Sequence, residues 1–320
     1  MKCSIIVSCH NCAYTLPIQI EVLSGQCRND ECEIIVVDNG SRDETVSVAK
    51  KLRHSIPNLR VLQANERKGF AHARNSAAQS AEGRFVLFCD GNDVAHNRWV
   101  ESMSQALEKH PFVAGRLITT EINLPWTIAA RPPEMQIEAT AAVETFGHLP
   151  WASAANIGIT RDLFDQCGGF NEELTALEDI DFSWRIQESG VDLTPVSESI
   201  VHYRLRNTMV GIFHQSLVYA LNFVRLSDLH QENGFSPPKP SFFSIIWTWL
   251  STVFSLFSFR RQHRGRLMWI LGWSTGSLIG IVKCRWLGRS PSASKEAQKA
   301  PLLRAFKSKQ SPKQQPQIFP

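Results

Sequence analysis

Residues 1–90 of this 320-residue chain alternate apolar, β-branched runs with segments of helical spacing. Buried strands are predicted by the apolar runs at residues 3–9, 33–37, 60–63 and 84–89. Helices are predicted between them at residues 15–24, 43–53 and 69–80. This alternation indicates parallel pairing, because each helix returns the chain to the same end of the sheet. We therefore expect an α/β fold with a mostly parallel, Rossmann-like sheet sandwiched by helices.

The fourth apolar run leads directly into an acidic turn. Residues 85–94 read FVLFCDGNDV, so Asp90, Asn92 and Asp93 follow the strand. Open α/β sheets bind ligands at the carboxyl ends of their strands. Clustered oxygen ligands suit a hard divalent cation such as Mg²⁺ or Mn²⁺, which usually accompanies phosphate. We expect a metal site here in an enzyme that handles a phosphate ester, and a polar surface turn is the alternative.

Other polar side chains are expected near the same edge of the sheet. A cleft lined by them could hold a nucleotide, with Asp38 accepting a hydrogen bond from a base N–H and Arg74 neutralising a phosphate. The candidate nucleotide contacts are Ser8, His10, Asn11, Asp38, Lys68, Arg74, Asp90, Asn92 and Arg204.

Four segments resemble the motifs of family 2 glycosyltransferases, which have the GT-A fold. They lie in family order within residues 1–206 and are 34–45 (IIVVDNGSRDET), 88–94 (FCDGNDV), 168–172 (GGFNE) and 178–185 (EDIDFSWR). The resemblance implies an inverting enzyme that moves a sugar from a nucleotide sugar, most commonly a UDP-sugar, to a hydroxyl group. It also implies that a bound metal stabilises the leaving diphosphate and that a carboxylate in the last segment removes the acceptor proton.

Asp179 is the first candidate for this catalytic base, and Glu178 is the second. Both are expected at the start of a helix over residues 178–188, where the helix dipole favours an ionised carboxylate at neutral pH. The alternative is that both carboxylates lie at the start of the helix without a catalytic role. Asp181 is expected either to assist the base or to pair with Arg185 one turn further on.

The sequence departs from the family pattern at position 92, where the family commonly has an aspartate and this chain has Asn92. An amide oxygen ligates a cation without adding charge, so weaker metal binding is predicted. His202 is a further candidate metal ligand, because the resemblance places a histidine near this point at the metal or diphosphate. A surface histidine with a structural role is the alternative.

The C-terminal part of the chain differs in composition from the rest. Residues 241–259 and 267–282 are apolar, and most of the excess positive charge follows Phe259. Basic residues beside apolar segments indicate an anionic membrane surface rather than nucleic acid as a partner. Interfacial helices, a membrane hairpin and a soluble helical cap are all compatible with this pattern. The spacing of Gly272, Gly276 and Gly280 predicts close helix packing in each case.

These observations divide the chain into four expected units. They are a nucleotide-sugar-binding subdomain at 1–115, an acceptor-binding subdomain with the base at 116–235, a membrane-associating helical segment at 236–290, and a basic disordered tail at 291–320. The apolar C-terminal helices predict an enzyme at the cytoplasmic face of a membrane. From that location we expect the acceptor to be a lipid-linked or envelope glycan.

The cysteines are expected to be reduced and mostly buried, because residues 1–8 do not resemble a signal peptide. A loosely zinc-like pattern is formed by Cys9, Cys12, Cys27 and Cys32. The spacing of the second pair does not fit a zinc knuckle.

Two other functions stay open at this point. A nucleotidyltransferase also pairs a parallel sheet with acidic metal ligands, but it needs a glycine-rich, basic loop after the first strand, which residues 8–12 lack. A non-catalytic relative that binds nucleotide sugars as a membrane scaffold would be favoured by loss of the base, whereas Glu178 and Asp179 are both present.

Overall fold

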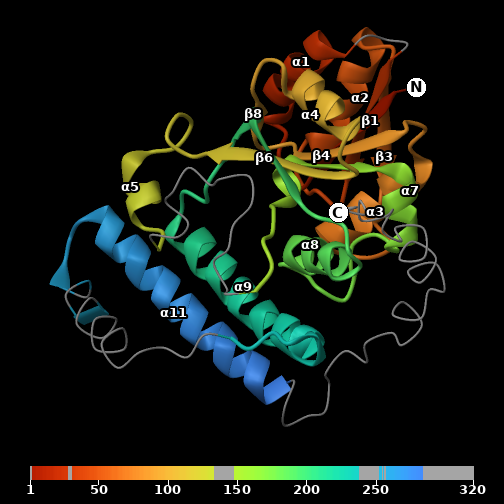
Figure 1. Cartoon of the computed structure of the whole chain (residues 1–320). Helices are drawn as coiled ribbons and strands as arrows, with labels where there is room; N and C mark the ends of the chain where they lie inside the picture. Colours follow the sequence, from red (N-terminus) through yellow and green to blue (C-terminus); the bar gives the residue numbers. More distant parts are fainter. Residues whose placement is uncertain are drawn as a thin grey trace, which may run out of the picture.

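The computed structural model describes residues 2–27, 31–132, 148–237, 252–253, 255 and 257–283. Within them the strands form one sheet in the order β3-β2-β1-β4-β7-β6-β8-β5 (Figure 1). The first half of this sheet is parallel, as predicted, and its strands are β1 (Cys3–Cys9), β2 (Cys32–Asp38), β3 (Leu59–Gln63) and β4 (Phe85–Asp90). The α/β fold is therefore confirmed.

The second half makes the sheet mixed rather than mostly parallel. Its strands are β5 (Val94–Ala95), β6 (Phe112–Ile118), β7 (Ile157–Thr160) and β8 (Thr194–His202). β7 runs antiparallel to both β4 and β6, and β8 is parallel to β6 but antiparallel to β5. Beyond residues 1–90 only β6 and β8 pair in parallel, so the prediction of a mostly parallel sheet holds for the first half alone. The later strands lack the regular succession of crossover helices that gives parallel pairing.

Helices cover both faces of the sheet. One face is covered by α1 (Leu16–Gln26), α2 (Thr45–Ser55) and α4 (Trp99–Leu107). The other is covered by α3 (Phe70–Ser80), α7 (Arg161–Gln166) and α8 (Glu178–Glu188). Successive strand residues point to opposite faces, so Ile5 and Val7 pack with the first group while Ile6 packs with the second. This burial on both faces explains why the strands are apolar at nearly every position.

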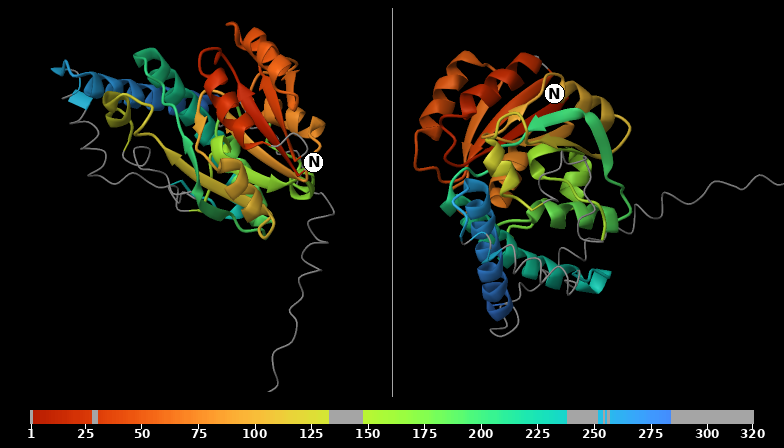
Figure 2. Two further views of the ribbon diagram at one scale, coloured as in Figure 1. Left: turned by 90° about the horizontal axis from the view of Figure 1, so that it is seen from above. Right: turned by 90° about the vertical axis from the view of Figure 1, so that its left-hand side faces the viewer.

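A long helical pair lies beside the sheet. It consists of α9 (Met209–His230), which ends in the short helix η2 (Gln231–Asn233), and α11 (Arg261–Ile281). The two helices run side by side, as Figures 1 and 2 show from three directions. Ser216 of α9 donates a hydrogen bond to the carbonyl of Trp269 at 2.6 Å. The short helices α5 (Pro125–Ala129) and η1 (Ala154–Asn156) complete the described elements.

The predicted close packing by glycines is confirmed at this helical pair. A Cβ atom on Gly276 would collide with the carbonyl group of Leu217, and one on Gly272 would collide with the carbonyl of Phe213. The backbones of α9 and α11 can approach this closely only because the glycines have no side chain.

Among the residues that the structure describes, none of the helices combines the length and the apolar character that a membrane crossing requires. The expected apolar C-terminal helices are therefore not supported in this part of the chain. α11 opens with Arg261, His263, Arg264 and Arg266, so only its later turns are apolar. Residues 241–251 and the predicted tail at 291–320 lie outside the described residues.

Cys27 and Cys32 form a disulfide, with their Cα atoms 5.7 Å apart. The expectation of reduced cysteines is wrong for this pair, which the ends of α1 and β2 bring within bonding distance. Cys9 and Cys12 are buried free thiols. The loosely zinc-like pattern of four cysteines is thus divided between a disulfide and two core residues.

Candidate active site

The carboxyl ends of three neighbouring strands place the main predicted residues side by side. Asp38 ends β2 and pairs in register with Cys9 of β1. Ser8, which precedes Cys9, pairs with Asp90 at the end of β4. The sequence prediction that these positions meet at one edge of the sheet is therefore confirmed, because the parallel register aligns the three strand ends.

The loop after β1 is fastened to the loop after β2. Asn11 has a positive φ of 54°, and its side-chain oxygen accepts a hydrogen bond from the backbone N–H of Arg42 at 2.8 Å. Its own N–H donates to the hydroxyl of Ser41 at 2.8 Å. His10 Nδ1 lies 2.9 Å from the carbonyl oxygen of Asn39. His10 and Asn11 thus shape the rim of the site, and their contact with a nucleotide stays a prediction.

The loop after β3, at residues 64–69, is held by Asn39, a residue that was not predicted from the sequence. Its amide nitrogen donates to the carbonyls of Ala64 and Arg67, and its oxygen accepts from the N–H of Gly69 at 2.7 Å. Lys68 lies in this fixed turn with an exposed side chain. The position of Asn39 directly after Asp38 was the available signal, since a strand-end amide is well suited to bind neighbouring backbone groups.

Two buried polar atoms at this edge have no hydrogen-bond partner among the described residues. They are Oδ1 of Asp38 and Oγ of Ser8. The other oxygen of Asp38 accepts a hydrogen bond from the N–H of Ser41 at 3.1 Å. A buried acceptor without a donor typically costs about 1–3 kcal/mol, so the site favours a ligand that brings an N–H to Asp38. A nucleotide base fits this requirement.

The acidic turn after β4 offers a second set of unsatisfied oxygens. Asp93 is fully buried; its Oδ1 accepts from the N–H of Arg204 at 2.7 Å, while its Oδ2 has no partner among the described residues. Burial, with a further contribution from the charge of Asp90, raises the pKa of Asp93 well above its ordinary value. Two carboxylates that disfavour each other's charge in a buried site fit a divalent cation, whose charge relieves that repulsion.

The remaining predicted metal ligands lie beside Asp93. Asn92 places its side-chain nitrogen 3.4 Å from Oδ1 of Asp93, and its carbonyl oxygen accepts a hydrogen bond from Nε of Arg204 at 2.8 Å. His202 ends β8 and pairs with Val94, the residue after Asp93. Its buried Nδ1 has no hydrogen-bond partner in the described chain and lies 3.6 Å from a carboxylate oxygen of Glu121. The structure thus places the four metal candidates at the end of β4, on the turn before β5 and at the adjoining end of β8, and their roles as ligands stay predictions.

Arg74 joins this acidic edge to the start of α8. Its Nη2 lies 3.0 Å from Oδ1 of Asp90, and its Nη1 lies 2.6 Å from Oε1 of Glu178. Burial opposes its charge, but these two carboxylates outweigh burial and raise its pKa above the ordinary value. Phe70 and Phe170 flank the guanidinium, with ring centroids 5.3 and 5.6 Å from its Cζ. Both terminal nitrogens are therefore bound to carboxylates, whereas sequence reasoning assigned Arg74 to a phosphate.

The candidate base lies at the start of α8, after a residue in an uncommon conformation. Leu177 has a φ of 61°, a left-handed value that is uncommon for a bulky apolar residue. Residues in such conformations cluster at functional sites. Asp179 accepts hydrogen bonds from the N–H groups of Ala154 and Ile180. Burial, then the charge of Glu178, raises its pKa to about 7 in spite of Arg74.

The pKa of Asp179 corrects the expectation that the helix dipole keeps this carboxylate fully ionised at neutral pH. Burial outweighs the dipole. A pKa near the working pH suits a general base, which must both accept and release a proton. Glu178 is bound to Arg74, whereas Asp179 forms no ion pair with the part of the chain that the structure describes and is held by backbone N–H groups. Asp181 instead pairs with Arg185 at 2.8 Å, which was one of the two expectations for it.

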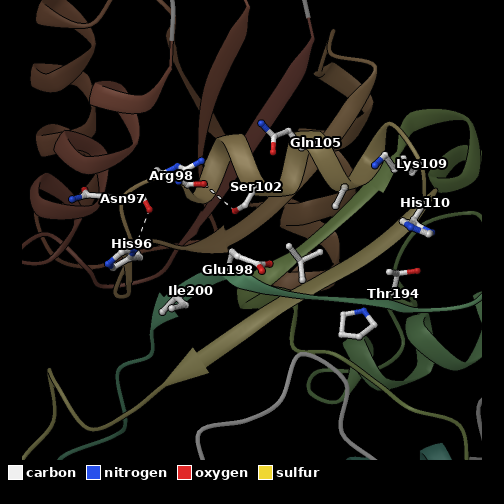
Figure 3. Close-up of a pocket in the computed structure, with 13 residues that line it drawn as sticks. His96, Asn97, Arg98, Ser102, Gln105, Lys109, His110, Thr194, Glu198 and Ile200 are labelled. Carbon is white, nitrogen blue, oxygen red and sulfur yellow. Dashed lines mark hydrogen bonds between the residues drawn. The ribbon is translucent and has the colours of Figure 1, made fainter.

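A separate groove of about 520 Å³ opens between α4 and β8 (Figure 3). His96, Arg98, Lys109 and Glu198 are among the side chains that line it. None of the predicted site residues lines this groove.

Comparisons with known proteins identify the family of this chain. The family model described as Glycosyl transferase family 2 matches residues 4–168. Glycosyltransferase AglE of Haloferax volcanii is 26% identical over 197 residues, which is 60% of this chain and 63% of AglE. The chain thus spans a little under two thirds of that relative's length.

Solved structures share the fold. A mannosyltransferase from Pyrobaculum calidifontis, PcManGT, solved with GDP-Man and Mn²⁺, superposes with a TM-score of 0.56 at 16% identity and covers 96% of this chain and 83% of its own. Residues 1–349 of TarS from S. aureus, solved with UDP-GlcNAc, give a TM-score of 0.52 at 20% identity, covering 87% of this chain and 91% of that one. At these identities the likeness concerns the fold alone.

Proposed function

The chain belongs to glycosyl transferase family 2 and is a glycosyltransferase, and we propose that it is a metal-dependent, inverting enzyme that moves a sugar from a nucleotide sugar to a hydroxyl group. The observation that carries this proposal is the bridge from Arg74 to Asp90 and Glu178. That bridge places the acidic edge of the sheet beside Asp179, so that a cation site and a base can act on one substrate.

The donor is proposed to bind across the strand ends. Asp38 would receive the N–H of the base through its unpartnered Oδ1. Asp90 and Asp93 would hold Mg²⁺ or Mn²⁺, with Asn92 and His202 completing the set of candidate ligands. When bound, that cation supplies the positive charge that stabilises the leaving diphosphate.

The chemical step is assigned to Asp179. It takes the proton of the acceptor hydroxyl as the acceptor oxygen bonds to the anomeric carbon, while the bond from that carbon to the diphosphate oxygen breaks. Attack from the face opposite the leaving group inverts the anomeric centre. General-base assistance of this kind is typically worth about 10²–10⁴ in rate. Glu178, held by Arg74, positions the start of α8 instead of accepting the proton.

A UDP-sugar is the proposed donor, and a lipid-linked or envelope glycan is the proposed acceptor. TarS was solved with UDP-GlcNAc, and PcManGT with GDP-Man, so proteins of this fold bind either nucleotide. Asp38 would accept from uracil or guanine alike, which makes a panel of donors the decisive test. Residues 1–115 are proposed to bind the donor and residues 116–235 the acceptor.

An anionic membrane surface at the cytoplasmic face is the proposed location. Apolar side chains are exposed before, on and just after α11, namely Phe257, Phe259, Leu271, Leu278, Ile281 and Val282. Arg260, Arg261, Arg264 and Arg266 follow Phe257 and Phe259 directly in the sequence, at the start of α11. Apolar side chains flanked by arginines favour shallow insertion among anionic headgroups. Sedimentation with vesicles tests this: binding to vesicles that contain an anionic lipid, and not to neutral ones, is expected.

The catalytic proposal is tested by nucleotide release from a panel of UDP-, GDP- and dTDP-sugars with Mn²⁺. Wild-type protein should release one nucleotide in preference, and Asp179→Asn should lower the rate by at least about 10². Asp162→Asn is the matched control, because Asp162 is an exposed carboxylate in the first turn of α7. Equal rates in wild type and Asp179→Asn would remove Asp179 from its assigned role.

A further inference from the structure

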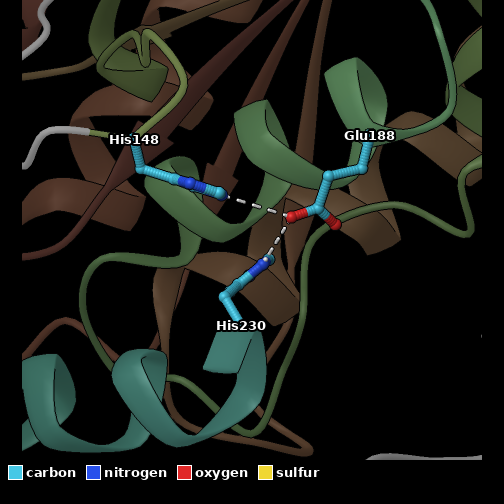
Figure 4. A group of neighbouring side chains, drawn as sticks. All are labelled: His148, Glu188 and His230. Atoms are coloured by element: carbon cyan, nitrogen blue, oxygen red, sulfur yellow. Dashed lines mark hydrogen bonds and ion pairs between the residues drawn. The ribbon is translucent and has the colours of Figure 1, made fainter. Parts of the chain in front are cut away.

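A second cluster of ionisable side chains lies at the far end of α8 from Asp179. It comprises His148, Glu188 and His230, which come from the segment before η1, the last residue of α8 and the last residue of α9 (Figure 4). Their ligand atoms all lie within 4.8 Å of one another. Because α8 is 11 residues long, the cluster lies about 15 Å along the helix from Glu178. It is therefore separate from the candidate active site.

The two imidazoles converge on one oxygen atom. Figure 4 shows both rings pointing at Oε1 of Glu188, which lies 3.5 Å from Nε2 of His148 and 3.0 Å from Nδ1 of His230. The other carboxylate oxygen accepts a hydrogen bond from Asn233 at 2.7 Å. Nε2 of His148 is buried and has no hydrogen bond within the described chain. Three potential ligand atoms thus face a common point, and one of them has no hydrogen bond to satisfy it.

A further carboxylate, that of Asp181, binds the outer ring nitrogen of His230. Asp181 lies 3.1 Å from Nε2 of His230, the ring nitrogen that faces away from the cluster. Its other oxygen is fixed by Nε of Arg185 at 2.8 Å. A carboxylate that binds the outer N–H of a histidine fixes the ring tautomer and leaves the inner nitrogen available as a metal ligand. Asp181 and His230 are both buried, so this orientation is well defined.

Aromatic rings enclose the cluster. Trp184 packs edge to face against both histidines, with ring centroids 4.7 Å from His148 and 5.1 Å from His230. Phe235 lies 5.5 Å from His148. An apolar shell restrains the imidazoles and limits access of water, which strengthens the binding of a cation by the groups inside it.

We propose that His148, Glu188 and His230 bind one zinc ion, with Asp181 orienting His230 and a water molecule in the fourth position. Two imidazoles and one carboxylate are a donor set that Zn²⁺ binds in tetrahedral sites, whereas Mg²⁺ prefers oxygen ligands alone. The ion joins the segment before η1 to the ends of α8 and α9. The bound ion would therefore hold α9, and with it α11, against the helix that carries Asp179.

The competing interpretation is an ion-pair network without a metal. In that state burial lowers the pKa of His230, but the hydrogen bonds to Asp181 and Glu188 outweigh burial and raise it to about 9. Within the described chain the network satisfies His230, but it leaves Nε2 of His148 with only a long contact of 3.5 Å to Glu188 and no hydrogen bond. A zinc ion satisfies all three side chains at once.

The test is metal binding by the full-length protein after treatment with a chelator. Zinc chloride is added in the presence of excess Mg²⁺, and bound metal is measured by mass spectrometry after gel filtration. Wild type should retain one zinc ion per chain, should show a higher melting temperature with zinc, and should give the visible absorption of tetrahedral Co²⁺ when cobalt replaces zinc. A wild-type protein that retains no zinc, with an unchanged melting temperature, would overturn the proposal.

Variants identify the ligands without relying on activity. His148→Ala and Glu188→Gln should each abolish stoichiometric zinc binding, and Asp181→Asn should weaken it by about 10–100-fold. Circular dichroism verifies that each variant is folded, and Glu188→Gln keeps the shape of the side chain. His54→Ala is the control, since His54 is an exposed histidine on α2. Asp93→Asn should keep the zinc, and its loss in that variant would assign the metal to the acidic edge instead.

Discussion

Arg74 on α3 donates a hydrogen bond from Nη1 to Oε1 of Glu178, the first residue of α8, over 2.6 Å and 104 residues of sequence. The same guanidinium holds Asp90 at 3.0 Å. One buried cation therefore connects the strand end that is proposed to bind the metal with the helix that carries the proposed base. This contact couples the positions of the two halves of the site through one side chain, beside the hydrogen bonds of Asn75 to the backbone of Phe170.

Replacement of Arg74 should destabilise the whole protein. Arg74→Ala leaves Glu178 buried without a counter-ion, which typically costs about 3–5 kcal/mol. Arg74→Lys keeps the charge but cannot span both carboxylates, so it should lower activity more than stability. Urea unfolding of both variants checks this, with Arg84→Ala as a control, because Arg84 makes its ion pair at the surface. Equal losses in Arg74→Ala and Arg84→Ala would contradict the bridging role.

The activity should depend on pH through Asp179. Its pKa is raised to about 7 by burial and by Glu178, so at lower pH the carboxyl group is protonated and cannot accept the acceptor's proton. We expect the turnover rate to rise about tenfold per pH unit below pH 7 and to level off above it. A pH–rate profile with saturating donor and metal measures this rise, the acidic limb of the profile.

Glu178→Gln should move that limb to lower pH. The substitution removes the like charge that raises the pKa of Asp179 and frees Arg74, whose charge lowers it. Both changes favour the ionised base, so the midpoint should fall while the rate at high pH changes less. A midpoint that stays in place would show that the limb reports another group.

Asp38→Asn should weaken nucleotide binding. In the wild type one oxygen accepts from Ser41 and the other is proposed to accept from the base, whereas an amide has only one acceptor oxygen. Loss of one hydrogen bond to a charged acceptor corresponds to a rise of about 10–100-fold in the dissociation constant. Calorimetric titration with UDP and GDP measures it. If the variant bound UDP and GDP as tightly as the wild type, the nucleobase would not contact Asp38.

Asn92→Asp should restore the family's usual carboxylate and tighten metal binding. A third negative charge beside Asp90 and Asp93 attracts the cation more strongly, but it repels its neighbours when the cation is absent. The melting temperature should therefore fall without Mn²⁺, and the stabilisation by Mn²⁺ with UDP should grow. Asn97→Asp adds the same charge at an exposed position and is the matched control.

Local patterns in the sequence were sufficient to predict the first half of the fold. The strands predicted at 3–9 and 84–89 are β1 and β4 to within one residue, and the helix predicted at 178–188 is α8. These elements follow from side-chain periodicity, which burial on defined faces imposes on the sequence. The strand order at the carboxyl edge then follows from parallel topology, so the meeting of Asp38 and Asp90 was predictable too.

The remainder depends on contacts between distant residues, which periodicity does not encode. β7 pairs antiparallel with β4, and nothing in the sequence of residues 157–160 predicts this pairing. Arg74 looked like a phosphate ligand because its sequence neighbours do not reveal Glu178. His148 and His230 were not singled out, since each lies alone in the sequence and only the ends of α8 and α9 bring them to Glu188.

The packing of α9 on α11 gives a prediction with an internal control. Gly276→Ala places a methyl group against the carbonyl of Leu217, so the helices must separate, and overpacking of this kind typically costs about 1–3 kcal/mol. Gly25→Ala lies inside α1, where a Cβ atom meets nothing within 4 Å, and should instead stabilise the protein by about 0.5–1 kcal/mol through helix propensity. Melting temperatures of the two variants should therefore move in opposite directions. A stabilising Gly276→Ala would mean that α11 does not pack on α9 in solution.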